Sequence, residues 1–321
     1  MKRSFTFIDL FAGIGGMRLG FEAVGGRCLL TCEIDSDAWK TYELNFKNRH
    51  KSHHYVADIF DLKSDLVKKL KPDVLVAGFP CQPYSIAGLR KGLKDERGQV
   101  FEEIIRILRD AKPESFLLEN VKGMLSHNGG KTYREIMKPM LQKVGYEVKE
   151  EVLNSMIHAN VPQNRERLFI VGFRTAKKLN DFRFPNPINL EKQIVDCLKN
   201  ETVKPHHFYD ERFGCYSVIK NQVKSSSTFY QWRRQYVREN KNKVCPTLTA
   251  NMGSGGHNVP LYRDKSRIRK LTPKECGNFQ GFPENFILPE GMAESRLYHQ
   301  FGNSVTVPLI QRIALEIRRV L

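Results

Sequence analysis

Residues 73–82, Asp-Val-Leu-Val-Ala-Gly-Phe-Pro-Cys-Gln, decide the fold class of this chain. The short apolar run that ends at Phe79 is typical of a strand buried on both faces of a parallel sheet. Cys81 follows after a single proline, and residues 83–88 are rich in turn-forming types. A thiol at the carboxyl end of such a strand lies where open α/β sheets hold their reactive groups.

Strand-like and helix-like segments alternate on both sides of this run. This alternation predicts an α/β fold with a doubly wound, mostly parallel sheet. The expected strands are 5–11, 28–34, 56–59, 73–79, 115–118, 147–153 and 168–173, and the expected helices are 16–24, 37–45, 65–70, 101–110 and 133–144.

The pattern changes near residue 175, where the chain becomes polar, basic and rich in Asn, Ser, Gly and Pro. We expect a smaller, irregular second domain there. Helical periodicity returns after Thr272, which forms a capping-box pattern with Glu275. Residues 307–321 predict an amphipathic helix that packs back on the sheet. The predicted domains are a discontinuous first domain, 1–180 with 270–321, and a second domain, 181–269.

The charge of the chain is unevenly distributed. The 321 residues contain 52 Lys and Arg against 35 Asp and Glu, and residues 174–270 alone hold 20 against 8. A concentrated positive charge favours a polyanionic partner, most often nucleic acid, over general solubilisation. No stretch approaches the roughly 20 apolar residues of a membrane span. Asp9 interrupts the one apolar run at the amino terminus, so no secretory signal is expected.

The cysteines and histidines do not form a metal-binding pattern. Seven cysteines without zinc-type spacing indicate free thiols in a reducing compartment, and two of them, Cys28 and Cys32, are expected in the core. The histidine pairs 53–54 and 206–207 have polar neighbours. We interpret them as surface or phosphate-contact residues, and we expect no metal site.

A glycine-rich turn, residues 11–16, joins the first expected strand to the first helix. Glycines there let the backbone approach a ligand closely. Arg18 stands where the dinucleotide fingerprint requires its third glycine, which disfavours a bound pyrophosphate. Glu33 and Asp58 end the next two strands, where carboxylates suit ribose hydroxyls and an adenine edge. This combination favours an S-adenosyl nucleoside over a dinucleotide.

From residue 5 to its end, the chain resembles the DNA (cytosine-5)-methyltransferases of bacterial restriction–modification systems, with the motifs in the family's order. The resemblance implies the class I S-adenosylmethionine-dependent methyltransferase fold, with the target-recognition region at about 190–265. The motifs are the cofactor motif 9–16, the nucleophile motif 78–82, the carboxylate motif 119–121, the paired-arginine motif 163–167, the segments 269–276 and 280–283 that close the recognition domain, and the last cofactor motif 300–305.

The resemblance also implies catalytic roles for four side chains. Cys81 is implied to be the nucleophile that adds to carbon 6 of a flipped-out cytosine, a reaction that suits a thiolate because it attacks well and leaves again. Glu119 is implied to contact ring nitrogen 3 and the exocyclic amine. Arg165 is implied to hold the carbonyl oxygen of the base and, with Arg167, to supply positive charge near the thiol. An Arg-Glu-Arg triplet is also compatible with a surface ion-pair ladder.

The implied ligand contacts form two further groups. Basic, glycine-punctuated residues 84–100 fit a mobile lid, and residues 230–238 interleave aromatic residues with arginines and a glutamine that can pair with base edges. The residues expected to bind S-adenosylmethionine are Phe11, Gly13, Gly15, Gly16, Glu33, Ile34, Asp58, Ile59, Pro80, Val100, Asn303, Ser304 and Val305. Those expected to contact DNA are Ser85, Arg90, Lys91, Gln231, Arg233, Arg234, Thr247, Gly255 and Gly256.

The implied activity is methyl transfer from S-adenosylmethionine to carbon 5 of a cytosine in a short duplex DNA site. We expect a monomeric, cytoplasmic bacterial enzyme that binds double-stranded DNA and no membrane, with a cognate restriction endonuclease as a candidate partner. A transfer-RNA-type cytosine-5 methyltransferase is the main alternative. A catalytically idle DNA-binding module and a nicotinamide oxidoreductase are weaker alternatives, the latter because of Arg18.

Overall fold

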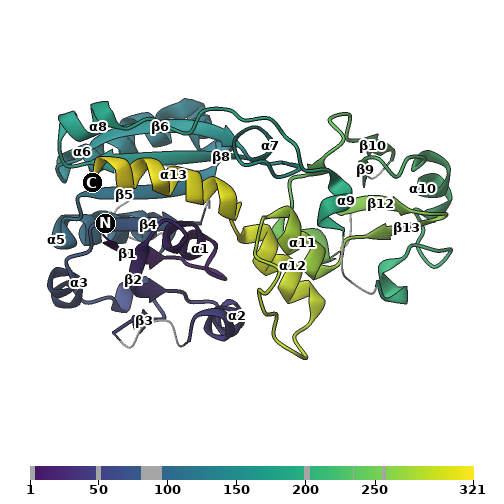
Figure 1. The fold of residues 1–321 in the computed structure, drawn as a ribbon, viewed down its shortest axis with the longest axis horizontal. Helices are drawn as coiled ribbons and strands as arrows, with labels where there is room; N and C mark the ends of the chain where they lie inside the picture. Colours follow the sequence, from purple (N-terminus) through teal and green to yellow (C-terminus); the bar gives the residue numbers. More distant parts are fainter. Residues whose placement is uncertain (1–3, 48–51, 81–95, 199–202, 234, 255–257) are drawn as a thin grey trace.

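The computed structural model of the protein shows two lobes joined by a pair of helices (Figure 1). The large lobe is built on the predicted sheet, and the small lobe (within residues 203–270) is built on a second sheet. The structure describes residues 4–47, 52–80, 96–198, 203–233, 235–254 and 258–321, and the side chains of all of these except 96–98 and 254.

The described residues of the large lobe form a seven-stranded sheet in the order β3-β2-β1-β4-β5-β8-β6. Strand β8 runs antiparallel to both of its neighbours, and the other adjacent pairs are parallel, so the predicted fold class is confirmed. The chain order reverses between β1 and β4, and ligands bind at the carboxyl ends of strands at such a point. The strands are β1 Phe5–Leu10, β2 Gly26–Cys32, β3 His54–Val56, β4 Val74–Gly78, β5 Ser115–Val121, β6 Glu147–Asn154 and β8 Glu166–Phe173.

Alternate side chains of the central strands enter two different cores. On one face of the sheet, Leu75 shares a hydrophobic cluster with Ile104 of α5 (Glu96–Ala111). On the other face, Val76 shares a cluster with Ile313 of the carboxyl-terminal helix. The predicted return of that helix to the sheet is therefore confirmed. The expected helix 133–144 differs, since it starts with a π-helical turn. The elements are α1 Gly16–Glu22, α2 Ser36–Phe46, η1 Ile59–Asp61, α3 Ser64–Leu70, α5 Glu96–Ala111, η2 Lys122–Leu125, η3 His127–Gly130, η4 Thr132–Met137, α6 Lys138–Lys143, α7 Ser155–His158, α8 Ala176–Asp181 and α13 Val307–Val320.

The small lobe is more regular than its sequence indicates. Its described residues form an antiparallel sheet, β10-β9-β12-β13, whose core includes Ile219, Tyr230 and Leu261. The strands are short and separated by polar loops, which hides their alternation in the sequence. The elements of this region are α9 Ile194–Cys197, η5 Pro205–His207, α10 Tyr216–Gln222, β9 Phe229–Trp232, β10 Val237–Glu239, β11 Cys245–Pro246, η6 Ala250–Ser254, β12 Pro260–Asp264 and β13 Arg267–Lys270.

Two helices, α11 Pro273–Phe279 and α12 Glu294–Asn303, lie between the lobes (Figure 1). The predicted capping box is present at the start of α11, where Thr272 and Glu275 exchange backbone and side-chain hydrogen bonds. Phe229 of the small lobe shares one hydrophobic cluster with Phe279 of α11 and Phe301 of α12. The two lobes are thus joined by a common core as well as by the chain.

Two compositional predictions can be compared with the described residues. The six cysteines among them are free thiols, and Cys28 and Cys32 lie in the core as expected. None of the described helices combines the length and the apolar composition that a membrane crossing requires.

Candidate active site at the carboxyl edge of the sheet

The glycine-rich turn is fixed by the end of strand β2. The Gly13 N–H donates a hydrogen bond of 2.6 Å to Glu33 Oε2, and the Asp35 N–H donates one of 2.7 Å to Glu33 Oε1. Burial raises the pKa of Glu33, an effect that the two N–H groups oppose. Each carboxylate oxygen retains a lone pair for a further donor.

The glycines of this turn serve different purposes. A Cβ atom on Gly15 would lie 2.3 Å from the Phe46 ring, and one on Gly16 would lie 2.8 Å from Ser304 Oγ and 2.9 Å from Val305 Cγ2. Gly13, at φ +55°, has open space at the same position. Gly15 and Gly16 are therefore required for packing, whereas Gly13 leaves its backbone accessible to a ligand.

Apolar side chains remain exposed at the ends of the neighbouring strands. Ile34 is 69% exposed and Phe60 is 48% exposed. Asp58 caps the short η1 helix by accepting the Phe60 N–H at 3.0 Å. Ile59, expected at the cofactor, is buried in the core instead. Exposed apolar groups beside a carboxylate suit a ligand with both a flat ring and hydroxyl groups.

An ion pair between a buried carboxylate and a half-buried guanidinium lies at the ends of β5 and β8. Arg167 Nε is 3.1 Å from Glu119 Oε1. The register pairs Val121 with Arg167, so Glu119 is the diagonal neighbour of Arg167 on the same face. Glu119 Oε2 lies 3.6 Å from the position of a Cβ on Gly78, which places the carboxylate beside the strand that leads to Pro80. Burial raises the pKa of Glu119, and the charges of both arginines oppose that shift.

Asn120 is a positioning residue that the sequence analysis did not single out. Its Nδ2 donates to the Phe79 carbonyl at 3.0 Å, and its Oδ1 accepts from the Val121 N–H at 2.8 Å. The side chain is buried and fixes the backbone just before Pro80. In the sequence, the signal for this role was an amide side chain directly after the motif carboxylate Glu119. Four expected residues of the segment that follows, Cys81, Ser85, Arg90 and Lys91, lie outside the described residues.

Arg165 has different partners from those that the resemblance implies. Its Nη1 donates to the Leu248 carbonyl at 2.8 Å, and its Nη2 donates to the carbonyls of Gly302 (3.2 Å) and Ser304 (2.5 Å). The side chain is 2% exposed. Burial lowers the pKa of Arg165 and Glu119 opposes that shift. Arg165 thus links three separate segments, and Arg167 is the arginine in contact with Glu119.

A buried set of polar contacts continues from Arg165 between the lobes. Gln163 Nε2 donates to the Phe279 carbonyl at 2.6 Å, and Gln163 Oε1 accepts from the Leu248 N–H at 3.1 Å. The backbone of Gln163 and Asn164 also forms strand β7, which pairs with β11. We call residues 163–165, 247–248, 279–280 and 302–306 the junction seam. Its buried amides hold the sheet edge and the small lobe in one arrangement.

Behind the glycine-rich turn lies a buried polar group. Arg18 donates to Glu22 and to the Tyr42 hydroxyl, both at 2.7 Å, so it is a packed residue rather than a ligand contact. Both carboxylate oxygens of Asp9 lack a hydrogen-bond partner among the described residues. Burial raises the pKa of Asp9 to about 8. This carboxyl group is therefore mostly protonated at neutral pH.

The model of the C-5 cytosine-specific DNA methylase family matches residues 5–319. The chain belongs to this family. It is 48% identical to the type II methyltransferase M.Bsp6I of Bacillus sp. (strain RFL6), over 95% of this chain and 96% of that protein, and 38% identical to M.DsaV of Dactylococcopsis salina, over 98% and 86%. A crystal structure of a putative DNA modification methyltransferase from an E. coli prophage has the same fold, with a TM-score of 0.73 at 21% identity over 99% of both chains. The predicted family and enzyme class are confirmed.

In the small lobe of this methylase, the residues expected to contact DNA differ in their exposure. Gln231 is only 8% exposed, because β9 is flanked on both sides by neighbouring strands. Arg233 is half-buried, and the Thr247 hydroxyl donates to the Asn164 carbonyl at 2.7 Å in the junction seam. The amide of Gln231 is therefore not available at the surface as a base reader. Arg234, Gly255 and Gly256 lie outside the described residues.

The remaining expected cofactor contacts differ in exposure. Ser304 and Val305 are buried against the glycine-rich turn, whereas Asn303 is exposed and Val100 of α5 is half-buried. Phe11 adopts φ +57°, a left-handed conformation that turns the chain sharply out of β1. The last cofactor motif therefore reaches the first one through the end of α12.

Proposed function

We propose that this methylase transfers a methyl group from S-adenosylmethionine to carbon 5 of a cytosine in a short duplex DNA site, with Cys81 as the covalent nucleophile. The observation that carries the proposal is the ion pair of the buried Glu119 with Arg167, whose Nε lies 3.1 Å from Glu119 Oε1 at the end of β5. The pair lies beside Gly78 on the strand that precedes Cys81. Family membership supports the reaction, and this geometry supports the roles that we assign to Glu119 and Arg167 in it.

Glu119 acts as the acid that supports thiol addition. When the Cys81 sulfur bonds to carbon 6, the electron pair of the carbon 5–carbon 6 double bond shifts toward carbon 4. Negative charge then develops at nitrogen 3. Burial raises the pKa of Glu119, which favours the protonated carboxyl group that this donation to nitrogen 3 requires. The resulting enamine-like ring has a nucleophilic carbon 5. Carbon 5 would then take the methyl group that bound S-adenosylmethionine supplies, and the sulfonium sulfur would keep the electron pair of the broken bond. Loss of the carbon 5 proton to a base, departure of the thiolate from carbon 6 and return of the nitrogen 3 proton to Glu119 restore the aromatic ring.

Arg167 takes the role that the resemblance assigned to Arg165. Both Nη atoms of Arg165 already donate to backbone carbonyls. Arg167 bonds Glu119 through Nε, and one of its Nη atoms donates to the Glu166 carbonyl at 2.8 Å. Its guanidinium has five N–H donors, so the remainder can hold the carbonyl oxygen of the base. We assign Arg165 to positioning and Arg167 to contact with the substrate.

The sheet edge also fits the proposed cofactor. S-adenosylmethionine, when bound, supplies an electrophilic methyl group on a sulfonium. The Glu33 carboxylate is oriented by two N–H groups and can accept hydrogen bonds from ribose hydroxyls. The exposed Ile34 side chain can cover one face of an adenine ring. The open backbone at Gly13 admits a ligand close to the turn. Asp58 can accept a hydrogen bond from the adenine edge.

The small lobe forms most of the proposed DNA-recognition domain, which spans residues 181–269 between the catalytic segments 1–180 and 270–321. Its separate core and its positive charge support this division. A thiol must approach carbon 6 from the face of the ring, which stacking covers in the duplex, so the target base must leave the duplex. Similarity to type II methyltransferases supports a modification role in a restriction–modification system of a bacterial cytoplasm. A monomer suffices for one flipped base.

The proposal can be tested with tritiated S-adenosylmethionine offered with duplex DNA or with transfer RNA. We expect label on DNA, loss of labelling in Cys81→Ala, and a covalent adduct with duplex containing 5-fluorocytosine. Cys215→Ala, which removes a half-buried thiol of the small lobe, is the matched control and should retain activity. Wild-type labelling by Cys81→Ala would overturn the covalent mechanism, and labelling of transfer RNA alone would overturn the substrate.

A further inference from the structure

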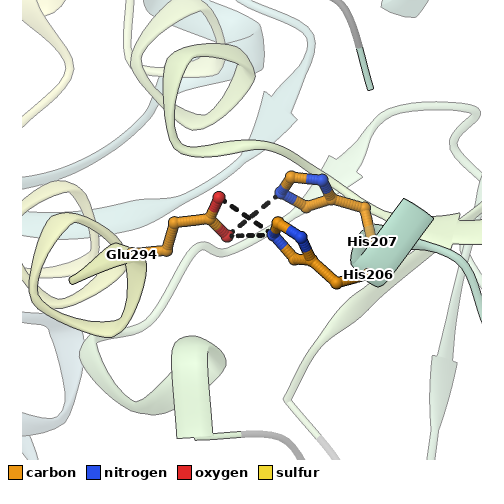
Figure 2. A group of neighbouring side chains, drawn as sticks. All are labelled: His206, His207 and Glu294. Carbon is orange, nitrogen blue, oxygen red and sulfur yellow. Dashed lines mark hydrogen bonds and ion pairs between the residues drawn. The ribbon is translucent and has the colours of Figure 1, made fainter. Parts of the chain in front are cut away.

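Two histidines and a glutamate converge at the junction of the lobes, outside the proposed active site (Figure 2). His206 and His207 belong to η5 of the small lobe, and Glu294 belongs to the first turn of α12. His206 Nε2 lies 3.0 Å from both oxygens of Glu294, and His207 Nε2 lies 3.1 Å from Oε2. One ligand atom from each residue lies within 4.8 Å of the others.

His207 is the informative member of this group. It is 2% exposed, which corrects the surface position expected from the sequence, whereas His206 is exposed as expected. Neither ring nitrogen of His207 has a hydrogen-bond partner among the described residues, although Nε2 points at the Glu294 carboxylate. A buried imidazole without a hydrogen bond is costly, and such groups in native proteins require an explanation.

The spacing of the three side chains suits a tetrahedral metal ion. Zinc binds imidazole nitrogen at about 2.0–2.1 Å and carboxylate oxygen at about 2.0–2.2 Å, so tetrahedral ligands are roughly 3.3 Å apart. The measured separations of 3.0 and 3.1 Å are close to that value. A cation between the three side chains would give His207 Nε2 a bond in addition to its ion-pair contact with Glu294.

We propose that His206, His207 and Glu294 bind one divalent ion of the zinc class, with water as the fourth ligand on the exposed His206 side. Two imidazoles select Zn²⁺, Co²⁺ or Ni²⁺ over the oxygen-preferring Mg²⁺ and Ca²⁺. The ion has a structural role, because it connects the small lobe to α12 and takes no part in the methyl-transfer chemistry. The positive charge of Lys270 also acts on Glu294 and limits the affinity.

The placement of Glu294 gives the ion a mechanical consequence. Helix α12 has 10 residues, so at about 1.5 Å per residue its ends are roughly 15 Å apart. Glu294 is at one end of the helix. Ser304 follows the other end, where its carbonyl accepts a hydrogen bond from Arg165 and its side chain packs on Gly16. Metal binding at η5 therefore stabilises the helix that carries the last part of the junction seam.

The test is metal titration of untagged, full-length protein that has been treated with a chelator and dialysed. Isothermal titration with Zn²⁺ should give one ion per chain, and Co²⁺ should give visible absorption bands of a four-coordinate site. Glu294→Gln and His207→Gln should each weaken Zn²⁺ binding at least about tenfold, since each removes one of three protein ligands. His54→Gln, which removes an exposed histidine of β3, is the matched control and should bind as the wild type does.

Two outcomes would overturn the proposal. The first is the absence of stoichiometric Zn²⁺ binding in the wild type, together with a Co²⁺ spectrum of the octahedral aqueous ion. The second is equal binding by the wild type and both ligand variants, which would identify an adventitious ion only. Circular dichroism checks that the variants fold. If a variant does not fold, the Co²⁺ spectrum of the wild type alone decides the question.

Discussion

Charged side chains at the sheet edge of the large lobe are buried and have fixed partners, whereas most of those on the small lobe are exposed. Glu33, Glu119 and Arg165 are each less than 9% exposed and each has contacts to specific atoms. Among the described residues of the small lobe, the exposed cations are Lys204, Arg212, Lys220, Lys224, Arg238, Lys241, Lys243, Lys265 and Arg267. Buried charges fix geometry for a reaction, and exposed charges attract a polyanion over a distance.

The largest expected effect is on the reaction itself. Glu119→Gln should lower the methyl-transfer rate by about 10²–10⁴-fold, because it removes a positioned proton donor, while DNA affinity changes little. Burial raises the pKa of Glu119, so the rate of the wild-type enzyme should fall as pH rises through that raised pKa. Single-turnover rates across a pH series measure both effects. A descending limb that persists unchanged in Glu119→Gln would show that another group provides it.

The two arginines should separate stability from rate. Arg165→Lys should lower the free energy of unfolding by about 3 kcal/mol, because an ammonium cannot serve three carbonyls in a forked geometry. Arg167→Lys is the matched variant, and it should reduce the methyl-transfer rate more than stability. Urea unfolding and single-turnover assays of both proteins provide the comparison. Equal losses of stability in the two variants would contradict the assignment of roles.

Asp9 tests the cost of ionising a buried carboxyl group. Its folded-state pKa of about 8 lies above the unfolded value, so the native state retains a proton that the unfolded chain loses between about pH 4 and 8. Its contribution to stability therefore falls as pH rises through that window. Asp9→Asn removes the ionisation and should be more stable than the wild type by about 1–3 kcal/mol at pH 8.5, and by less at pH 5. A stability difference that is independent of pH would be inconsistent with this account.

The smallest effects are expected on the exposed surface of the small lobe. Arg238→Ala and Lys241→Ala should each weaken DNA binding a few-fold and reduce the slope of log affinity against log salt by up to about 0.9. The rate at saturating DNA should not change. Lys69→Ala, which removes an exposed charge of the large lobe, is the control. An identical salt slope in all four proteins would remove these residues from the proposed DNA surface.

Much of the architecture was predictable because it depends on local order along the chain. The apolar run before Cys81, the glycine-rich turn and the carboxylate at Glu33 each follow or end a strand, and the carboxyl ends of parallel strands share one edge. The capping box at Thr272 was also visible as a local pattern. The antiparallel sheet of the small lobe was not predictable, because its short strands depend on pairing between segments rather than on periodicity.

The sequence by itself determined the family, the sheet, and which carboxylates lie at its edge, since position along a strand is a local property. Only the tertiary structure decided which arginine meets Glu119. Arg165 and Arg167 are two residues apart, but the register of β8 on β5 places one beside the carboxylate, and the turn before β8 directs the other into the junction seam. The approach of His207 to Glu294 likewise joins segments that are distant in sequence, and only the docking of the small lobe on α12 brings them into contact.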